Sequence, residues 1–342
     1  MSGAALRKGY LDLKLEAQQP FVPEWSVAIF SSRESAGTLV KSVRAVLSAI
    51  ERDAFVDIIV NGNEPLAQEI AGFVDGFKPD MAGRLLLRLW FIAEGDKAHA
   101  WNQYLYGIWP GARLTYFVDG YVRVHRHAFT RIATALAEDS HAMAATGVPT
   151  QGRTSAKLRA DMQRSNGIHG NLYAVRAPVL DALRQRRFIL PLGIYRTDSL
   201  LGAAIKFNFD PARHRWDRHR IRVVLEASWE HTPLSVTRLA DLKAQLRRVL
   251  RQERGTLELL AIRQHLDMER NSLESLPETV TDLVNEWLQN QPGQLWRTLA
   301  RRPLSVLSLR SIRQKRDWSK ATIPPRMLAV SAIGLATHTS FP

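Results

Sequence analysis

A carboxylate stands directly after a short apolar run in the middle of the chain. The run from Leu114 to Val118 reads LTYFV, and Asp119-Gly120 follows it. Strand-forming residues bounded by turn residues predict a buried strand that ends at Asp119. Ligands of open α/β sheets bind beyond the carboxyl ends of the strands. Asp119 is therefore a candidate ligand for a cation, although Asp-Gly is also ordinary turn chemistry.

A second carboxylate, Asp198, stands at the start of an apolar stretch, in the sequence Thr197-Asp198-Ser199-Leu200. A carboxylate beside an acceptor hydroxyl can take up its proton as a general base. The same residue can instead cap a helix, because Asp is favoured at the N-cap position. The two roles are compatible, and both interpretations stay open.

Several nitrogen-containing side chains are candidates for binding a polyanionic ligand. Lys97, Arg123 and Arg126 could supply part of the positive charge that such a ligand needs. His125 and His127 are interpreted as a solvated or hydrogen-bonded pair, since imidazole prefers softer metals than Mg²⁺.

Three further polar residues have a functional and a structural interpretation. Glu34 and Asn61 follow the first two strand-like runs, where they could contact a ligand or simply form turns. Arg248 could bind a phosphate bidentately. It could equally be a charge on the polar side of an amphipathic helix, because the apolar residues around it recur at helical spacing.

These residues need a scaffold, and the chain alternates between strand and helix patterns. Apolar strand-like runs occur at 25–30, 55–60, 85–92 and 114–118, and helical spacing at 36–52, 64–74 and 97–106. This alternation predicts an α/β fold with a mainly parallel sheet and helices on both faces. No GxGxxG or GxxxxGK[ST] motif is present, so neither a dinucleotide fingerprint nor a P-loop is supported.

Four segments in order, SVAIFSSRES, DIIVNGN, GDKAHAWN and YFVDGYV, resemble a family 2 glycosyltransferase with the Rossmann-like GT-A fold. Gly95, Lys97, Ala100 and Asn102 match that family's Gly-x-Lys/Arg-x-x-Ala-x-Asn helix start. Asp119 matches the first Asp of its Asp-x-Asp metal motif.

The resemblance continues to about residue 255. Segment 167–183 is similar to the acceptor-side part of the family. Asp198 matches the second position of a Glu-Asp pair, and Gln245 and Arg248 match the Gln-x-x-Arg-Trp pattern.

Three positions depart from the family pattern. Tyr121 replaces the second Asp of the metal motif, Thr197 replaces the Glu of the pair, and Val249 replaces the final Trp. The departures leave the mode of metal binding open and argue against a processive polymer synthase.

The resemblance implies a non-processive, bacterial-type enzyme that moves a sugar from a nucleotide sugar to an acceptor hydroxyl on a glycan or lipid-linked saccharide, with inversion. It implies Mg²⁺ or Mn²⁺ at Asp119, Asp198 as base, and Arg248 at the catalytic site. The residues that it assigns to nucleotide-sugar binding are Glu34, Asn61, Lys97, Asn102, Asp119, Gly120 and Tyr121. The alternative is a catalytically inactive nucleotide-sugar-binding or scaffold subunit of a glycan-assembly complex.

Composition limits the remaining possibilities. The 342 residues carry a formal net charge of +14 and no cysteine. Disulfides, thiolate metal sites and cysteine catalysis are therefore excluded. The N-terminus lacks the apolar core of a signal peptide, and no run of 18 apolar residues occurs. We expect a cytoplasmic protein with polyanionic partners.

Three regions are expected: a lead-in at 1–24, a GT-A-like catalytic domain at 25–255, and a helical, basic extension at 256–342. Within the extension, residues 295–320 combine basic, tryptophan and leucine residues, as suits the inner face of a cytoplasmic membrane. The alternative is an appendage packed on the catalytic domain or against another subunit. Nucleic acid ranks lower as a partner, because no recognisable binding motif occurs.

Overall fold

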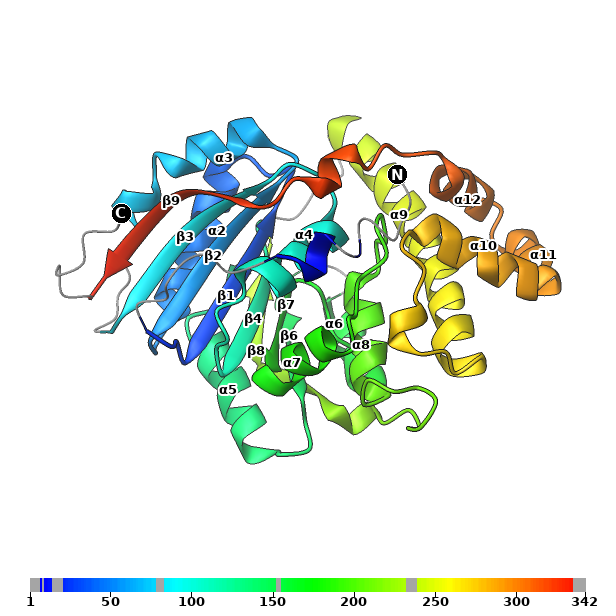
Figure 1. The fold of residues 1–342 in the computed structure, drawn as a ribbon, viewed down its shortest axis with the longest axis horizontal. Helices are drawn as coiled ribbons and strands as arrows, with labels where there is room; N and C mark the ends of the chain where they lie inside the picture. Colours follow the sequence, from blue (N-terminus) through cyan, green and yellow to red (C-terminus); the bar gives the residue numbers. More distant parts are fainter. Residues whose placement is uncertain are drawn as a thin grey trace.

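A single mixed sheet organises the protein (Figure 1). The computed structural model describes residues 7, 9–13, 21–77, 83–151, 155–231 and 239–334. In these ranges nine strands pair in the order β5-β8-β6-β7-β4-β1-β2-β3-β9. Their bounds are β1 (Trp25–Ser31), β2 (Ala54–Asn61), β3 (Leu85–Ile92), β4 (Leu114–Asp119), β5 (Arg123–Val124), β6 (Ala144–Pro149), β7 (Leu172–Arg176), β8 (Ile221–Glu230) and β9 (Arg326–Ile333).

The centre of the sheet is parallel. β3, β2, β1 and β4 run in the same direction, so the carboxyl ends of all four strands meet at one edge. The flanks are mixed, because β7 and β9 pair antiparallel with β4 and β3, whereas β6 and β8 are parallel to each other. The predicted α/β class and parallel centre are confirmed, and the antiparallel flanks are a feature that the sequence pattern did not predict.

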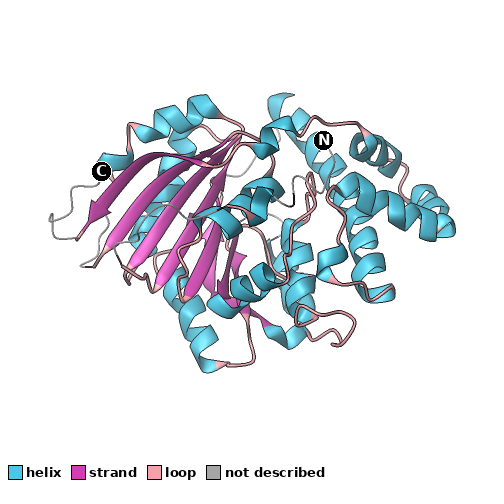
Figure 2. Ribbon diagram, viewed as in Figure 1, coloured by secondary structure: helices cyan, strands magenta, loops and turns pink. Residues whose placement is uncertain are grey.

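Helices cover both faces of the sheet (Figure 2). Because strand side chains alternate between faces, Val27 and Ile29 of β1 pack into one core and Ala28 and Phe30 into the other. The helices are α2 (Ala36–Ala49), α3 (Glu64–Ala71), α4 (Lys97–Gln103), α5 (Ala128–Glu138), α6 (Ser155–Ser165), α7 (Ala177–Gln185), α8 (Thr197–Lys206), α9 (Leu239–Arg263), α10 (Val280–Asn290), α11 (Pro292–Arg301) and α12 (Ser305–Arg313). α2, α3 and α5 belong to the first core, and α4, α7, α8, α9, α10 and α12 contribute to the second.

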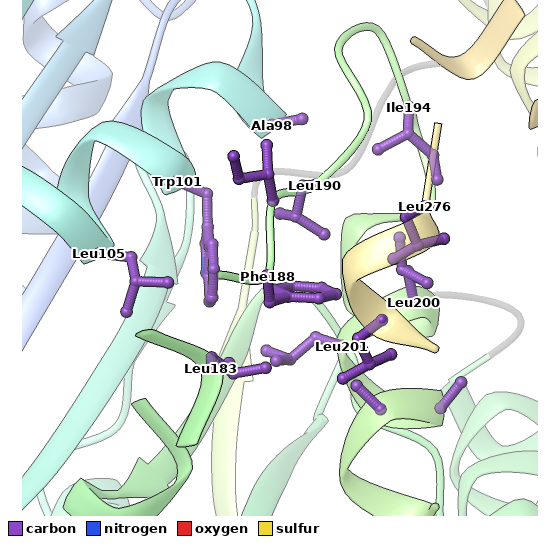
Figure 3. Close-up of a cluster of buried hydrophobic side chains, with 14 of the residues drawn as sticks. Ala98, Trp101, Leu105, Leu183, Phe188, Leu190, Ile194, Leu200, Leu201 and Leu276 are labelled. Atoms are coloured by element: carbon purple, nitrogen blue, oxygen red, sulfur yellow. The ribbon is translucent and has the colours of Figure 1, made fainter. Parts of the chain in front are cut away.

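The short helix α4 is anchored by aromatic packing. Trp101 stacks on Phe117 of β4 with ring centroids 5.9 Å apart, and its indole N–H donates to the Tyr173 hydroxyl (3.2 Å). Figure 3 shows Trp101 beside Phe188 and Leu190, in the segment that leads toward α8. This cluster fixes α4 relative to both β4 and α8.

The C-terminal region is part of the same body. α9 runs without a break through Gly255, so the domain boundary expected there falls inside a helix. α9, α10 and α12 share the second core, and β9 returns to extend the main sheet beside β3 (Figure 1). The region after 255 is therefore not a separate, purely helical extension. In the described part of the chain, no helix is both long and apolar enough to cross a membrane.

Candidate functional site

An ion pair joins the end of β4 to the start of α4. The Lys97 ammonium donates to Oδ1 of Asp119. The Lys97 side chain is 37% exposed and that of Asp119 is 15% exposed, so the pair borders the surface. Burial lowers the pKa of Lys97, but attraction to Asp119 and then Asp198 outweighs it, and the net pKa is raised. Lys97 thus stays charged at neutral pH.

The turn before α4 is held by backbone constraints at two strand ends. Asp96 caps the helix by accepting from His99 N–H (2.9 Å), and its other oxygen accepts from Gly193 N–H (3.1 Å). Gly62 has φ +68°, and a Cβ there would lie 2.3 Å from the Cα of Gly95. Glycine is required for this approach, which sets the position of Lys97.

Asn61 and Glu34 hold the turns at the carboxyl edge of the sheet. With its amide oriented to satisfy both neighbours, Asn61 Nδ2 donates to Ser31 O (2.9 Å) and Oδ1 accepts from Asp96 N–H (3.2 Å). Glu34 Oε2 accepts from the Ser31 hydroxyl (2.7 Å) and from the N–H groups of the two residues before it (2.7 and 2.9 Å). Their nucleoside contacts stay a prediction.

Asn102 has a structural role. Its side chain is fully buried (0% exposed). Its Nδ2 donates to Leu190 O (3.0 Å), and its Oδ1 accepts from Leu190 N–H (2.9 Å). Because Leu190 binds both polar atoms, Asn102 positions the segment before α8, and its contact with a donor stays a prediction.

Gly120 and Tyr121 shape the turn after Asp119. A Cβ on Gly120 would lie 2.7 Å from the Cβ of Ser31, so only glycine allows this approach to β1. The Tyr121 hydroxyl lies 3.2 Å from Asp119 Oδ2 and 2.9 Å from Asn171 Oδ1. Burial and the charge of Asp119 raise the pKa of Tyr121 well above its usual value. The neutral Tyr121 hydroxyl thus stands at the position where the Asp-x-Asp motif has its second carboxylate.

Asp198 lies in the first turn of α8 and belongs to the same cluster. Its Oδ2 accepts from Gly170 N–H (3.1 Å), and its Oδ1 accepts from Ser199 N–H (2.8 Å). A Cβ on Gly170 would lie 3.5 Å from Asp198 Oδ2 and 3.6 Å from Lys97 Nζ. Asp198 and Lys97 therefore border the same glycine. Asp198 is therefore not the N-cap of α8, as one interpretation of the sequence had it. The N-cap residue is Arg196.

A buried carboxylate from α9 holds the loop before Asp198. Glu258 is fully buried and accepts from the N–H groups of Tyr195 and Arg196 (2.9 Å each) and from Arg254 Nε (2.8 Å). Arg254 also donates to Gly193 O. Burial raises the pKa of Glu258, and Arg254 partly offsets this effect. Sequence reasoning missed Glu258, which lies beyond the expected domain boundary.

His169 is a second residue that sequence reasoning missed. Burial lowers its pKa, although the charges of Asp198 and Asp119 oppose the shift. Its Nδ1 accepts from Asn171 N–H (3.3 Å), and its ring lies 5.1 Å from that of Trp229. A neutral imidazole therefore stands next to the cluster. In the sequence, what could have pointed to His169 was its position immediately before Gly170, in segment 167–183.

The remaining basic candidates lie outside the Lys97–Asp119 pair. Arg123 pairs with Glu230 (2.9 Å), and His127 Nδ1 lies 3.2 Å from a carboxylate oxygen of Glu51. Arg126 is exposed. Arg248 is in α9, but its side chain lies outside the described residues, so its catalytic role stays a prediction.

The protein groups around Asp119 do not form a complete metal site. Within the described ranges, no three His, Asp or Glu side chains gather as they would around a metal ion. Both oxygens of Asp119 already face donors, Lys97 and Tyr121. Divalent Mg²⁺ takes about six oxygen ligands, and here it would find one carboxylate in competition with an ammonium. The arrangement therefore does not fit a protein-built Mg²⁺ or Mn²⁺ centre.

Sequence comparisons give no relatives: no known family profile and no curated protein matches the chain. Several solved structures are similar to this one. A mannosyltransferase from Pyrobaculum calidifontis in complex with GDP-Man and Mn²⁺ aligns over 90% of each chain, with 13% identity and a TM-score of 0.49.

Two other solved structures are similar to this one. Glucosyl-3-phosphoglycerate synthase from Mycobacterium tuberculosis, in complex with Mn²⁺, UDP-glucose and phosphoglyceric acid, aligns over 77% of this chain and 84% of its own (14% identity, TM-score 0.43). GalNAc-T7 with UDP, GalNAc and Mn²⁺ aligns over 79% and 55% (12% identity, TM-score 0.42). With TM-scores below 0.5 and identities of 12–14%, these similarities assign no residue role and no substrate to this chain.

Proposed function

We propose that this protein transfers a sugar from a nucleotide-sugar donor to an acceptor hydroxyl. The observation that carries the proposal is the position of the Lys97 ammonium, which is bound to Asp119 and adjoins Asp198, at the carboxyl ends of parallel strands. A cation and two carboxylates at this edge supply what the reaction needs: charge for a leaving diphosphate and a base for the acceptor.

Lys97 is the group that stabilises the leaving diphosphate. In the transfer, the acceptor oxygen forms a bond to the anomeric carbon while the bond from that carbon to the diphosphate oxygen breaks. The bonding electrons pass to the diphosphate, whose growing negative charge lies beside the ammonium. A preorganised charge of this kind needs little reorganisation as the reaction proceeds.

Asp198 receives the proton of the acceptor hydroxyl. Its two oxygens each accept one backbone N–H, from Gly170 and Ser199, and this fixes the carboxylate. Displacement in one step by the activated hydroxyl inverts the anomeric centre. Mg²⁺ or Mn²⁺, which the motif resemblance implies, would supply additional Lewis-acid charge; Asp119 could hold it only together with oxygens of the donor diphosphate and water, and we assign no step to it.

A donor-hydrolysis screen tests this function without knowledge of the acceptor. Purified protein is incubated with several nucleotide sugars, with and without Mn²⁺, and the release of nucleoside diphosphate is measured. We expect slow release from one donor, and loss of that release in Asp119→Asn. Asp198→Asn is the matched variant, which should keep donor hydrolysis but lose transfer once an acceptor is found. The absence of both turnover and nucleotide binding would refute the proposal.

The second candidate function is a nucleotide-sugar-binding or scaffold subunit without turnover. It is favoured by Tyr121 and Thr197, which stand where the family pattern has carboxylates. This function predicts nucleoside diphosphate binding that is measurable by calorimetry, with no hydrolysis of any donor. The same screen therefore separates the two functions.

A further inference from the structure

Helix α12 buries only one of its sides. Ser305, Ser308, Leu309 and Ile312 are buried, at the spacing of three and four that marks one side of a helix. The Ser308 hydroxyl donates to Leu250 O of α9 (3.0 Å). The inner side of α12 is therefore fixed on α9, and its other side is turned away from the core.

The outward side begins with three large apolar residues in four positions. Leu304 is 41% exposed, Val306 is 51% exposed and Leu307 is 53% exposed. Solvent exposure of such residues has a cost, because each loses the stabilisation that burial of apolar surface provides. A compact exposed apolar group on an otherwise well-packed protein is typical of an interaction surface.

The segment that carries this apolar group is positively charged, although Glu253 of α9 pairs with Arg302 and accepts from the Ser305 hydroxyl. Residues 292–316 contain seven Lys and Arg and no Asp or Glu. Arg310 follows Val306 by four positions and lies on the same side of α12. Arg297 of α11 and Arg301 at its end are exposed as well. We call this set, Leu304, Val306, Leu307, Arg297, Arg301 and Arg310, the α12 outer face.

The chemistry of the α12 outer face suits an anionic membrane surface. Its arginines border a very small apolar group, and positive charge of this kind complements anionic lipid headgroups. Lipid headgroups can pair with those arginines while the leucine and valine side chains enter the acyl boundary.

The chain passes from the α12 outer face directly to the candidate site. Three residues after α12 ends at Arg313, the Arg316 guanidinium lies 3.9 Å from carboxylate oxygens of both Glu94 and Asp96. Asp96 is the residue before Lys97. Because three extended residues span at most about 11 Å, the C-terminal end of α12, where Arg310 and Arg313 lie, is close to the loop that carries Lys97.

We propose that the α12 outer face docks the protein on an anionic membrane, on the cytoplasmic side, and thereby presents the Lys97–Asp119 site to an acceptor held in that membrane. The part that concerns the acceptor rests on the proposed glycosyl transfer, whereas membrane docking does not. A lipid-linked saccharide is the class of acceptor that this arrangement suits.

Vesicle cosedimentation tests the docking. Wild-type protein is mixed at low salt with vesicles of phosphatidylcholine alone or of phosphatidylcholine with phosphatidylglycerol. We expect binding only to the anionic vesicles, decreasing as salt is added. Each Arg→Gln change at Arg297, Arg301 or Arg310 should weaken partitioning about fivefold. The triple variant Leu304→Ser, Val306→Ser, Leu307→Ser should weaken it by about tenfold or more.

Matched controls come from a different part of the surface. Lys41→Gln with Arg44→Gln on α2 removes exposed positive charge, and Leu225→Ser on β8 removes an exposed apolar side chain. These variants should bind vesicles like the wild type.

Three results would overturn the proposal: no binding of the wild type to anionic vesicles, equal losses in test and control variants, or binding to an oligonucleotide in place of vesicles. Donor hydrolysis, measured on the same proteins without vesicles, should be unchanged in every one of them. Failure of docking can therefore be told apart from failure of the proposed function.

Discussion

In the proposed transfer, Lys97 is the residue whose loss should matter most, because its ammonium is the cation bound to Asp119. We expect Lys97→Met to reduce donor hydrolysis by about 100- to 1,000-fold, the effect of removing one preorganised donor from a developing oxyanion. Initial rates of nucleoside diphosphate release measure this. Lys41→Met, an exposed lysine on α2, is the control. A drop of less than threefold would show that Lys97 has no role in the leaving group's stabilisation.

Tyr121 determines how well the site can bind a metal. The change Tyr121→Asp places a second carboxylate beside Asp119, and two carboxylates attract a divalent cation more strongly than one. We expect Mn²⁺ to bind this variant at least about tenfold more tightly than the wild type, as measured by titration calorimetry. Tyr121→Phe removes only the hydroxyl and should bind Mn²⁺ no better than the wild type. Equal affinity in all three proteins would contradict the account given for the metal.

Asp119, Asp198 and Lys97 could be chosen as candidates from the sequence, because each stands at a recognisable start or end of an element, and the structure brings them close together. The roles of Asn102 and Glu258 could not. Asn102 binds Leu190, which is 88 positions away, and Glu258 binds Tyr195 from 63 positions away. A buried hydrogen-bond partner at that distance along the chain leaves no local signal in the sequence.

At the scale of elements, the side-chain amide of Asn102 holds α4 and the segment before α8 together. Asn102→Ala would leave the N–H and C=O of Leu190 buried without partners, at about 1–3 kcal/mol for each group. We expect a total loss of about 2–6 kcal/mol in the free energy of unfolding, measured by urea denaturation. Gln252→Ala, an exposed position on α9, should change it by less than about 0.5 kcal/mol. Equal stability of the two variants would argue against this positioning role.

Helix α4 also contains a histidine that links stability to pH. His99 is fully buried, and burial lowers its pKa from 6.5 to about 4. The unfolded chain therefore binds the proton more readily. The contribution of the neutral His99 ring to the stability of the folded state is complete above pH 6.5 and is lost as the pH falls toward 4. At about 1.4 kcal/mol for each pKa unit, the loss approaches about 3 kcal/mol.

His99→Gln should remove this part of the acid sensitivity, since glutamine does not titrate. The measurement is the difference in unfolding free energy between pH 7 and pH 4.5, compared between variant and wild type. His127→Gln is the control, because His127 is an exposed histidine. An unchanged pH dependence in His99→Gln would show that other groups control acid unfolding.

Gly255, where the resemblance to the family ends, lies inside α9. Glycine after an apolar helical pattern is normally a stop signal. Here α9 continues through it, and a Cβ at Gly255 would lie 2.4 Å from Nε of Arg196. The glycine makes room for a tertiary contact with the loop before α8. The four central strands, by contrast, were predictable, since buried parallel strands give continuous apolar runs.

At the scale of the whole molecule, β9 protects an edge of the sheet. β3 is buried along nearly its whole length and pairs with β9 on its outer side. A chain that ends after Pro325 would expose the backbone hydrogen-bonding groups of β3, and such edges promote aggregation. We expect this truncation to aggregate on mild heating, as followed by light scattering. The full chain with Val330→Thr, which keeps a β-branched residue in β9, should remain monodisperse, and a monodisperse truncation would contradict the argument.

The order of the strands also has a consequence during synthesis. β9 begins 234 positions after β3 ends (326 minus 92). At about 5–20 residues per second, a ribosome needs roughly 12–47 s to make the intervening chain. Throughout that time the outer edge of β3 has no partner, and the late pairing must also overcome the entropy of closing a very long loop. The nascent chain should therefore depend on a chaperone that shields this strand until the final segment emerges.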